Sequence, residues 1–274
     1  MSLSSPRTLG FLVLLTVYGS SAQNPSLQAQ SASSPKPKRH DSVEVVAHLS
    51  PEEVEEGKLN DAYELIAQLQ RKGTCTTEII QRYQSEVIPL AEKSTFNVPK
   101  NKFLFLANRD IGNCYMAQRR YEEAEQSFKK IMEYLPIWPG TNDSDYPINF
   151  RQIATAQMAQ QHWEAAEDSL NKSVSLFDPQ IQEALKSDNE FGRTEHAGNL
   201  FGSKGRSLAY LGIVYLREGR NAEALKTAES AYKEATQPHV PSMLYNEVVK
   251  IGRSIAEACG DGEATAKWSQ RSLH

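Results

Sequence analysis

Apolar residues recur three and four positions apart along most of the chain after residue 50, which is the spacing of one face of an α-helix. The first such segment begins at Ser50-Pro51, where serine is a favourable helix cap and proline fits the first turn. Gly73 can adopt the left-handed conformation that ends a helix. The apolar face between these signals is formed by Leu59, Ala62, Tyr63, Leu65, Ile66 and Leu69. Strand patterns are nearly absent, so the sequence predicts an all-α domain over residues 51–274.

Breakers divide the rest of this region into further helices. A second helix is expected to open at Thr76 or Thr77 and to run through Val87, with Pro89 kinking or ending it. No helix is expected to cross residues 97–99, which read Asn-Val-Pro. Near the C-terminus, a helix over residues 241–259 and a polar helix over about residues 263–272 are expected to close the domain.

One pattern of small and large residues occurs three times. The segments IGNCY, IATAQ and LGIVY end at Tyr115, Gln157 and Tyr215, and each is followed by a second segment, YEEAEQSF, WEAAEDSL or NAEALKTA. Twelve residues separate a small residue in the first segment from an alanine in the second, in the pairs Gly112 and Ala124, Ala154 and Ala166, and Gly212 and Ala224. The chain therefore contains an internal repeat of a helix pair.

The small residues predict close contact within each helix pair, because antiparallel helices approach tightly only where side chains are small. Larger residues would form a layer shared with the neighbouring pair, and these are Ile111, Tyr115, Phe128, Ile153, Leu170, Leu211 and Tyr215. A lone pair cannot bury this face, so the pairs are expected to stack. Gly219 is expected to supply a left-handed turn between two helices.

At these positions the chain resembles the tetratricopeptide repeat (TPR) family, whose pattern is W-x₂-L-G-x₂-Y, then Ala, Phe and Pro. The first copy matches at Ile111, Gly112, Tyr115, Ala124, Phe128 and Pro136, and the third at Leu211, Gly212, Tyr215 and Ala224. The copies lie 42 and 58 residues apart, whereas the family period is about 34. Extra residues lie over 137–146 and 179–205, the latter with an expected short helix near residues 180–186. The resemblance implies a TPR-like solenoid of about five antiparallel helix pairs.

The resemblance also implies a function, because proteins of this family bind a peptide or a partner helix along the concave surface lined by their first helices. The residues expected on that surface are Arg109, Asn113, Met116, Arg151, Gln152, Arg206 and Tyr210. Some family members hold a C-terminal carboxylate with basic and amide side chains, and four of these residues are of the matching kinds, Arg109, Asn113, Gln152 and Arg206. The alternative is a solvated basic face without such a clamp.

The N-terminal residues 1–22 have the pattern of an export signal. A single basic residue, Arg7, precedes an apolar run from Leu9 to Tyr18, and small residues at Ser20 and Ala22 suit cleavage before Gln23. The apolar run of roughly ten residues is short of the ~20 that span a bilayer as a helix. Residues 23–50 are rich in Ser, Gln and Pro and are expected to form a disordered linker. We therefore expect a periplasmic or secreted protein, with an uncleaved membrane anchor as the alternative.

Charge and residue spacing do not favour other classes of function. A net charge of −4 gives no indication of nucleic-acid binding. The histidines lack metal-binding spacing and no phosphate-loop motif is complete, so no metal, cofactor or catalytic residue is expected. The expected function is a scaffold for a protein or peptide partner. Two alternatives stay open: an accessory subunit of an envelope or secretion assembly, and a hydrolase built on a helical solenoid.

The three cysteines allow at most one intramolecular disulfide. Cys114 is expected to be a small buried apolar residue, because it lies beside the close contact at Gly112. Pairing of Cys75 with Cys259 is disfavoured, since they lie at helix ends far apart in the expected stack.

Overall fold

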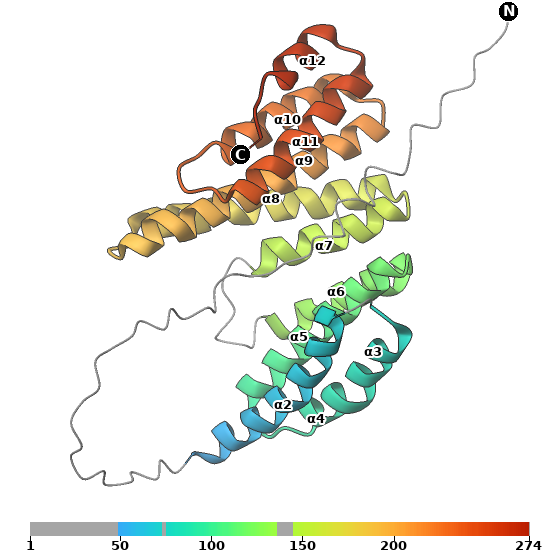
Figure 1. Ribbon diagram of the computed structural model, residues 1–274, viewed down its shortest axis with the longest axis vertical. Coiled ribbons are helices and arrows are strands. Elements are labelled where there is room, and N and C mark those ends of the chain that lie inside the picture. Colours follow the sequence, from blue (N-terminus) through green and yellow to red (C-terminus); the bar gives the residue numbers. More distant parts are fainter. Residues whose placement is uncertain (1–48, 73–74, 136–144, 274) are drawn as a thin grey trace, which may run out of the picture. The chain divides into compact units, whose positions relative to one another are not determined.

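The computed structural model describes residues 49–72, 75–135 and 145–273 of the chain. Every regular element in these ranges is a helix, and the helices form five consecutive antiparallel pairs (Figure 1). The all-α, TPR-like solenoid of about five helix pairs is therefore confirmed. The pairs are α2 (Pro51–Lys72) with α3 (Thr77–Arg82), η2 (Tyr83–Val87) and α4 (Ile88–Glu92); α5 (Asn97–Ala117) with α6 (Tyr121–Tyr134); α7 (Asp145–Ala159) with α8 (Trp163–Lys186); α9 (Ala197–Arg217) with α10 (Asn221–Ala235); and α11 (Ser242–Cys259) with α12 (Gly262–Ser269).

Polar side chains begin several of these helices. Ser50 Oγ accepts a hydrogen bond from the Glu53 backbone N–H at 3.2 Å, and Glu53 Oε2 accepts one from the Ser50 N–H at 2.7 Å. This reciprocal arrangement is a capping box, and it satisfies donors that the helix itself leaves without partners. Thr76 Oγ1 accepts from the Ile79 N–H at 3.3 Å, which confirms the predicted start of the second helix.

The predicted break between helices is present but lies at residues 93–96, slightly before residues 97–99. The latter residues form the first turn of α5, which begins at Asn97. The backbone N–H groups of a first turn have no partner within the helix, so Pro99 loses no hydrogen bond there. Its ring is buried against the neighbouring structure.

Pro89 does not end the second helix. The chain passes from α3 through the wider π-helical turn η2 into α4, and Pro89 lies in the first turn of α4. The Ile88 N–H donates to the Tyr83 carbonyl, five residues earlier. This wider turn accommodates a ring that would clash with a carbonyl in regular α-helix.

The extra residues 179–205 do not form a separate insertion with its own short helix. Instead, α8 continues through Pro179 to Lys186, and α9 begins at Ala197 directly after η4 (Gly192–His196). The two extended ends enclose a small apolar core made of Phe177, Ile181, Ala184, Ala197 and Leu200.

The three copies of the repeat have the same turn between their helices. Arg119, Gln161 and Gly219 have left-handed φ angles of 61°, 64° and 77°. The next residue in each turn donates its N–H to the carbonyl of Tyr115, Gln157 or Tyr215, at 2.9, 2.9 and 2.8 Å. The left-handed turn predicted at Gly219 is confirmed, and two non-glycine residues adopt it as well.

Close packing within the pairs follows the prediction in part. Ala124, Ala154, Ala166 and Ala224 are all fully buried. A Cβ added at Gly212 would lie 3.3 Å from the Ala224 carbonyl oxygen, so these two residues do face each other. A Cβ added at Gly112 would instead lie 2.5 Å from the Phe128 ring, so the space left by this glycine is filled by an aromatic side chain.

Cys75 and Cys114 form a disulfide, so the expectation that Cys114 is only a small buried apolar residue is wrong. Their Cα atoms lie 4.7 Å apart, within the range that a disulfide spans. The bond joins the start of the second helix to α5, whereas Cys259 is a free thiol.

Several predictions fall outside the described residues. These are the export signal over 1–22, the linker over 23–50 except for Leu49 and Ser50, the repeat position Pro136, and most of the segment 137–146. Across the described ranges, no helix combines the length and the apolar character needed to cross a membrane.

Candidate functional site

The residues predicted to bind a partner come from α5, α7 and α9, the first helices of three successive pairs. Four of them have side chains that are only partly buried: Arg109, Asn113, Gln152 and Arg206. The other three are buried, Met116 at 6% exposed, Arg151 at 8% and Tyr210 at 3%. Met116 belongs to the apolar core around α5. Met116, Arg151 and Tyr210 therefore do not lie on an open surface, and the prediction is corrected for these three.

Arg109 is held by groups of its own chain. Its Nε lies 3.3 Å from Asp110 Oδ1, and its Nη2 donates to the Tyr63 hydroxyl at 3.5 Å. Burial disfavours the charged guanidinium, but nearby Asp110 and Tyr63 outweigh it and raise the pKa of Arg109. The same aspartate accepts hydrogen bonds from Tyr63 at 2.6 Å and Tyr83 at 3.2 Å, so Arg109 is the outer member of a buried polar network.

Asn113 and Gln152 connect α5 to α7. The Gln152 side-chain amide donates to Asn113 Oδ1 at 3.5 Å, which is a long hydrogen bond. Each amide has further donor or acceptor capacity beyond this contact. The structure therefore brings together two of the predicted residues from helices 39 positions apart in the sequence.

Arg206 and Tyr210 meet a carboxylate from α11. Arg206 Nε lies 2.7 Å from Glu247 Oε1, and the Tyr210 hydroxyl donates to the same oxygen at 2.9 Å. Burial, assisted by Glu247, raises the pKa of Tyr210, and the positive charges of Arg206 and Arg151 oppose that rise. Sequence reasoning missed Glu247, since no spacing signal relates α11 to α9.

A second recurring arrangement, also missed from the sequence, closes the turns of the first and third copies. Arg120 stacks on Tyr115 with 4.4 Å from its guanidinium carbon to the ring centroid, and it pairs with Glu123 at 2.9 Å. Arg220 stacks on Tyr215 at 4.0 Å and pairs with Glu223 at 2.7 Å. The tyrosine, arginine and glutamate have the same spacing in both copies, and this spacing could have predicted the arrangement from the sequence.

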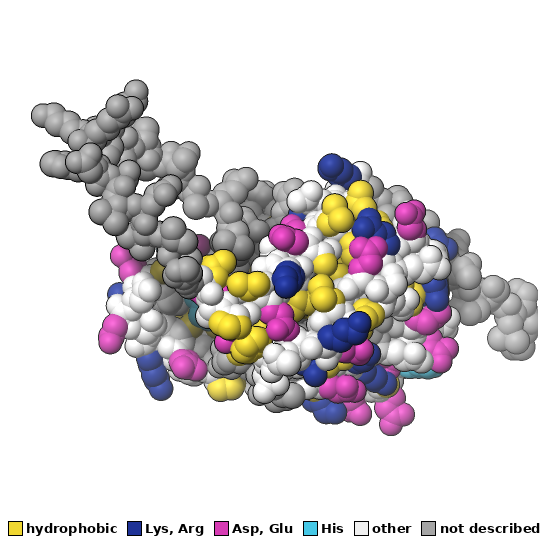
Figure 2. All heavy atoms as spheres, turned by 90° about the horizontal axis from the view of Figure 1, so that it is seen from below, with side chains coloured by type: hydrophobic (Ala, Val, Ile, Leu, Met, Phe, Trp, Pro, Cys, Tyr) yellow, Lys and Arg dark blue, Asp and Glu magenta, His cyan; other side chains and the backbone are white. Residues whose placement is uncertain are grey.

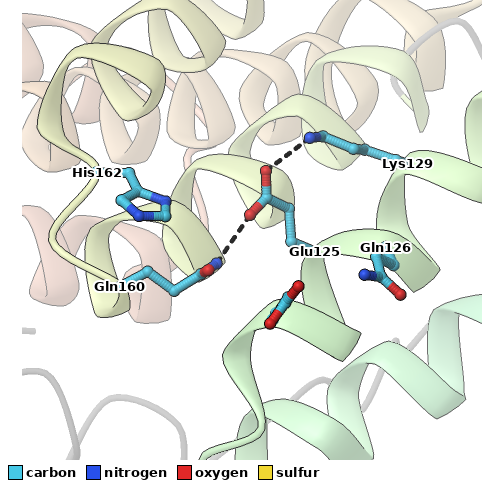
Figure 3. A pocket seen from close by; sticks show the side chains of 6 residues that line it. Glu125, Gln126, Lys129, Gln160 and His162 are labelled. Carbon is cyan, nitrogen blue, oxygen red and sulfur yellow. Dashed lines mark hydrogen bonds and ion pairs between the residues drawn. The ribbon is translucent and has the colours of Figure 1, made fainter.

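The middle copy lacks this closure. Gln157, His162 and Ala165 stand at the positions of tyrosine, arginine and glutamate. At this place the surface has an open hollow between α6 and the turn from α7 to α8 (Figure 3). Its lining residues are Glu122, Glu125, Gln126, Lys129, Gln160 and His162.

Glu125 forms the floor of this hollow. Its Oε1 accepts from Gln157 Nε2 at 2.9 Å and lies 2.7 Å from Lys129 Nζ, while Oε2 accepts from Gln160 Nε2 at 2.8 Å. Burial disfavours the carboxylate, but the hydrogen bonds from Lys129, Gln157 and Gln160 outweigh burial and lower the pKa of Glu125. Glu125 is therefore ionised at neutral pH.

The described residues contain no group of three or more His, Cys, Asp or Glu side chains arranged to hold a metal ion. The chemistry of this face is hydrogen bonding and ion pairing.

Comparison with known proteins agrees with the repeat architecture. A tetratricopeptide repeat family model matches residues 110–142. No curated protein is significantly similar to the sequence. The fold is similar to two crystal structures of nearly identical TPR-like repeats of a putative kinesin light chain from Podosopora anserina. The first, of a variant with one substitution, has a TM-score of 0.55 at 15% identity, covering 81% of this chain and 94% of that one. The second has a TM-score of 0.53 at 15% identity, covering 79% and 99%. The described residues therefore have a TPR-like helical-repeat fold.

Proposed function

We propose that this protein is an exported scaffold that binds a protein or peptide partner on the face lined by α5, α7 and α9. A TPR-like fold suggests a protein-interaction scaffold. The observation that carries the proposal is the Asn113–Gln152 contact, which sets two partly buried amides from successive helix pairs side by side. Partly buried apolar side chains of the same helices, Leu106, Ile148 and Ile213, would supply apolar contact area.

The polar contacts favour recognition of a peptide backbone over a carboxylate clamp. Arg109 and Arg206 already pair with Asp110 and Glu247, so a carboxylate ligand would have to compete with these two acids. Amide groups can donate to and accept from a backbone without displacing an ion pair. We therefore expect an extended segment of the partner to lie across Asn113 and Gln152.

Two features support export. The first 22 residues have the composition of a signal peptide. The second is the Cys75–Cys114 disulfide, because structural disulfides persist mainly in oxidising compartments such as the periplasm and the extracellular space.

Site-specific photocrosslinking tests the binding face. A benzophenone amino acid at Gln152 of the full-length chain, expressed in cells that export it, is expected to crosslink a partner. The matched control carries it at Ser230, an exposed residue on the second helix α10. Equal crosslinking from both positions, or none from Gln152, would contradict the proposed face. A single stoichiometric partner within a large assembly would identify the protein as an accessory subunit of that assembly.

A further inference from the structure

In the third copy, an arginine fills the place that is equivalent to the hollow in the middle copy. Arg220 occupies the position that His162 has in the middle copy, 58 residues earlier. Its guanidinium lies 2.7 Å from Glu167 Oε2, 2.9 Å from Glu218 Oε2 and 2.7 Å from Glu223 Oε2. The repeat thus contains an internal example of a guanidinium bound at this turn.

The acid that receives Arg220 has a counterpart in the hollow. Glu167 and Glu125 are equivalent residues of α8 and α6, 42 positions apart. Both accept from the first helix of the next pair, Glu167 from Tyr215 and Glu125 from Gln157. In place of the arginine, the middle copy has the shorter His162, so the space above Glu125 stays open (Figure 3).

The remaining contacts of Glu125 leave room for a cation. Gln157 and Lys129 approach Oε1, whereas Gln160 alone of these three approaches Oε2. A carboxylate oxygen can accept two hydrogen bonds, so Oε2 can take a further donor. Lys129 is 59% exposed and can move aside, and Glu122 adds a second carboxylate at the edge of the hollow.

We propose that this hollow binds an arginine side chain of a partner protein, with the guanidinium in the place that Arg220 fills in the next copy. Arginine fits better than lysine because its planar guanidinium can donate to two acceptors at once, here Glu125 and Glu122. The hollow lies between α6 and the α7–α8 turn and is not part of the Asn113–Gln152 face. The inference therefore does not rest on the proposed function and can fail or hold separately.

The test measures binding of a blocked arginine, Nα-acetyl-arginine methylamide, to the full-length protein by NMR of the Gln157 and Gln160 side-chain amides. Saturable shifts are expected with the arginine probe, shifts at least about threefold smaller with the matching lysine probe, and none with the uncharged citrulline probe. His162→Arg should fill the hollow from within, as Arg220 does, and abolish the shifts.

A matched pair of variants checks the site without relying on His162. Glu122→Gln should weaken binding of the arginine probe, whereas Glu164→Gln, the equivalent position of the next copy, should leave it unchanged. The proposal is overturned if no saturable shift occurs, if citrulline binds as well as arginine, or if binding survives in His162→Arg. Equal weakening by the two glutamine variants would also overturn it.

Discussion

The N-terminal helices α2 to α5 and the pair α9–α10 are held together by different means. Around α2 to α5 the core is aromatic and cross-linked. The ring of Tyr63 lies 5.8 Å from that of Tyr83 and 5.9 Å from that of Phe103, and a disulfide joins Cys75, just before α3, to α5. In the pair α9–α10, the second helix instead buries small residues against the first, and these are Ala224, Ala228, Ala231 and Ala235.

This difference indicates where each half is vulnerable. A core of alanine and glycine depends on the backbones staying close, since no large side chain can refill a gap. Helices α2 to α5 should therefore be sensitive to loss of their cross-link, and the pair α9–α10 to added volume. Figure 2 shows the molecule from below the view of Figure 1, and apolar and charged side chains are interspersed on this face.

Removing the disulfide should have the largest effect. The bond closes a loop across 39 positions, and the chain-entropy relation gives about 4 kcal/mol of lost stability for a loop of that length. Cys75→Ser combined with Cys114→Ala should lower the free energy of unfolding by that order in denaturant titrations. Amide hydrogen exchange in the double variant should accelerate more in α2 to α5 than in α9 and α10.

The control for this experiment is Cys259→Ser, which removes the free thiol and should leave stability nearly unchanged. If the double variant accelerated exchange equally in α9 and α10, the two halves would not differ in the way described.

A pair of glycine substitutions should have the next largest effect, with opposite signs. A Cβ added at Gly205 would lie 2.9 Å from the Ala231 carbonyl oxygen, so Gly205→Ala must push α9 and α10 apart. Overpacking of this kind costs about 1–3 kcal/mol, against a gain of about 1 kcal/mol in helix propensity. At Gly57 in α2, no atom lies within 4 Å of an added Cβ. Gly57→Ala should therefore stabilise the protein by about 1 kcal/mol, the gain in helix propensity. Thermal melting measures both, and a stabilising Gly205→Ala would refute close backbone packing between α9 and α10.

The fold was largely predictable from the sequence, because helix periodicity and the twelve-residue spacing of small residues are local signals. The failures occurred where distant segments decide the outcome. The spacing of Cys75 and Cys114 does not show that the start of the second helix packs on α5. Pro89 and Pro99 predict breaks in the helices, but a π-helical turn and a first-turn position accommodate them.

The candidate site was less predictable than the fold. Helical geometry placed Arg109, Asn113, Gln152 and Arg206 on the first helices, and they are partly exposed there. The same geometry could not show that Met116 would be covered by neighbouring pairs. It also could not show that Glu247 would pair with Arg206, because both outcomes depend on how successive pairs stack.

The smallest predicted effect lies at α6 and α7, which Glu125 connects through hydrogen bonds from Gln157 and Gln160. Its pKa is lowered from 4.5 in the folded protein, so its charged form stabilises the fold above that pH. The contribution is lost as the pH falls through the lowered folded pKa. Glu125→Gln should cost on the order of 1 kcal/mol near neutral pH, because it removes charge-assisted hydrogen bonds from Lys129, Gln157 and Gln160. The stability difference from wild type should then shrink as the pH falls through the lowered folded pKa of Glu125, because the wild-type carboxyl becomes neutral there. A difference that stays constant over this range would mean that neutral contacts, and not the carboxylate charge, join α6 to α7.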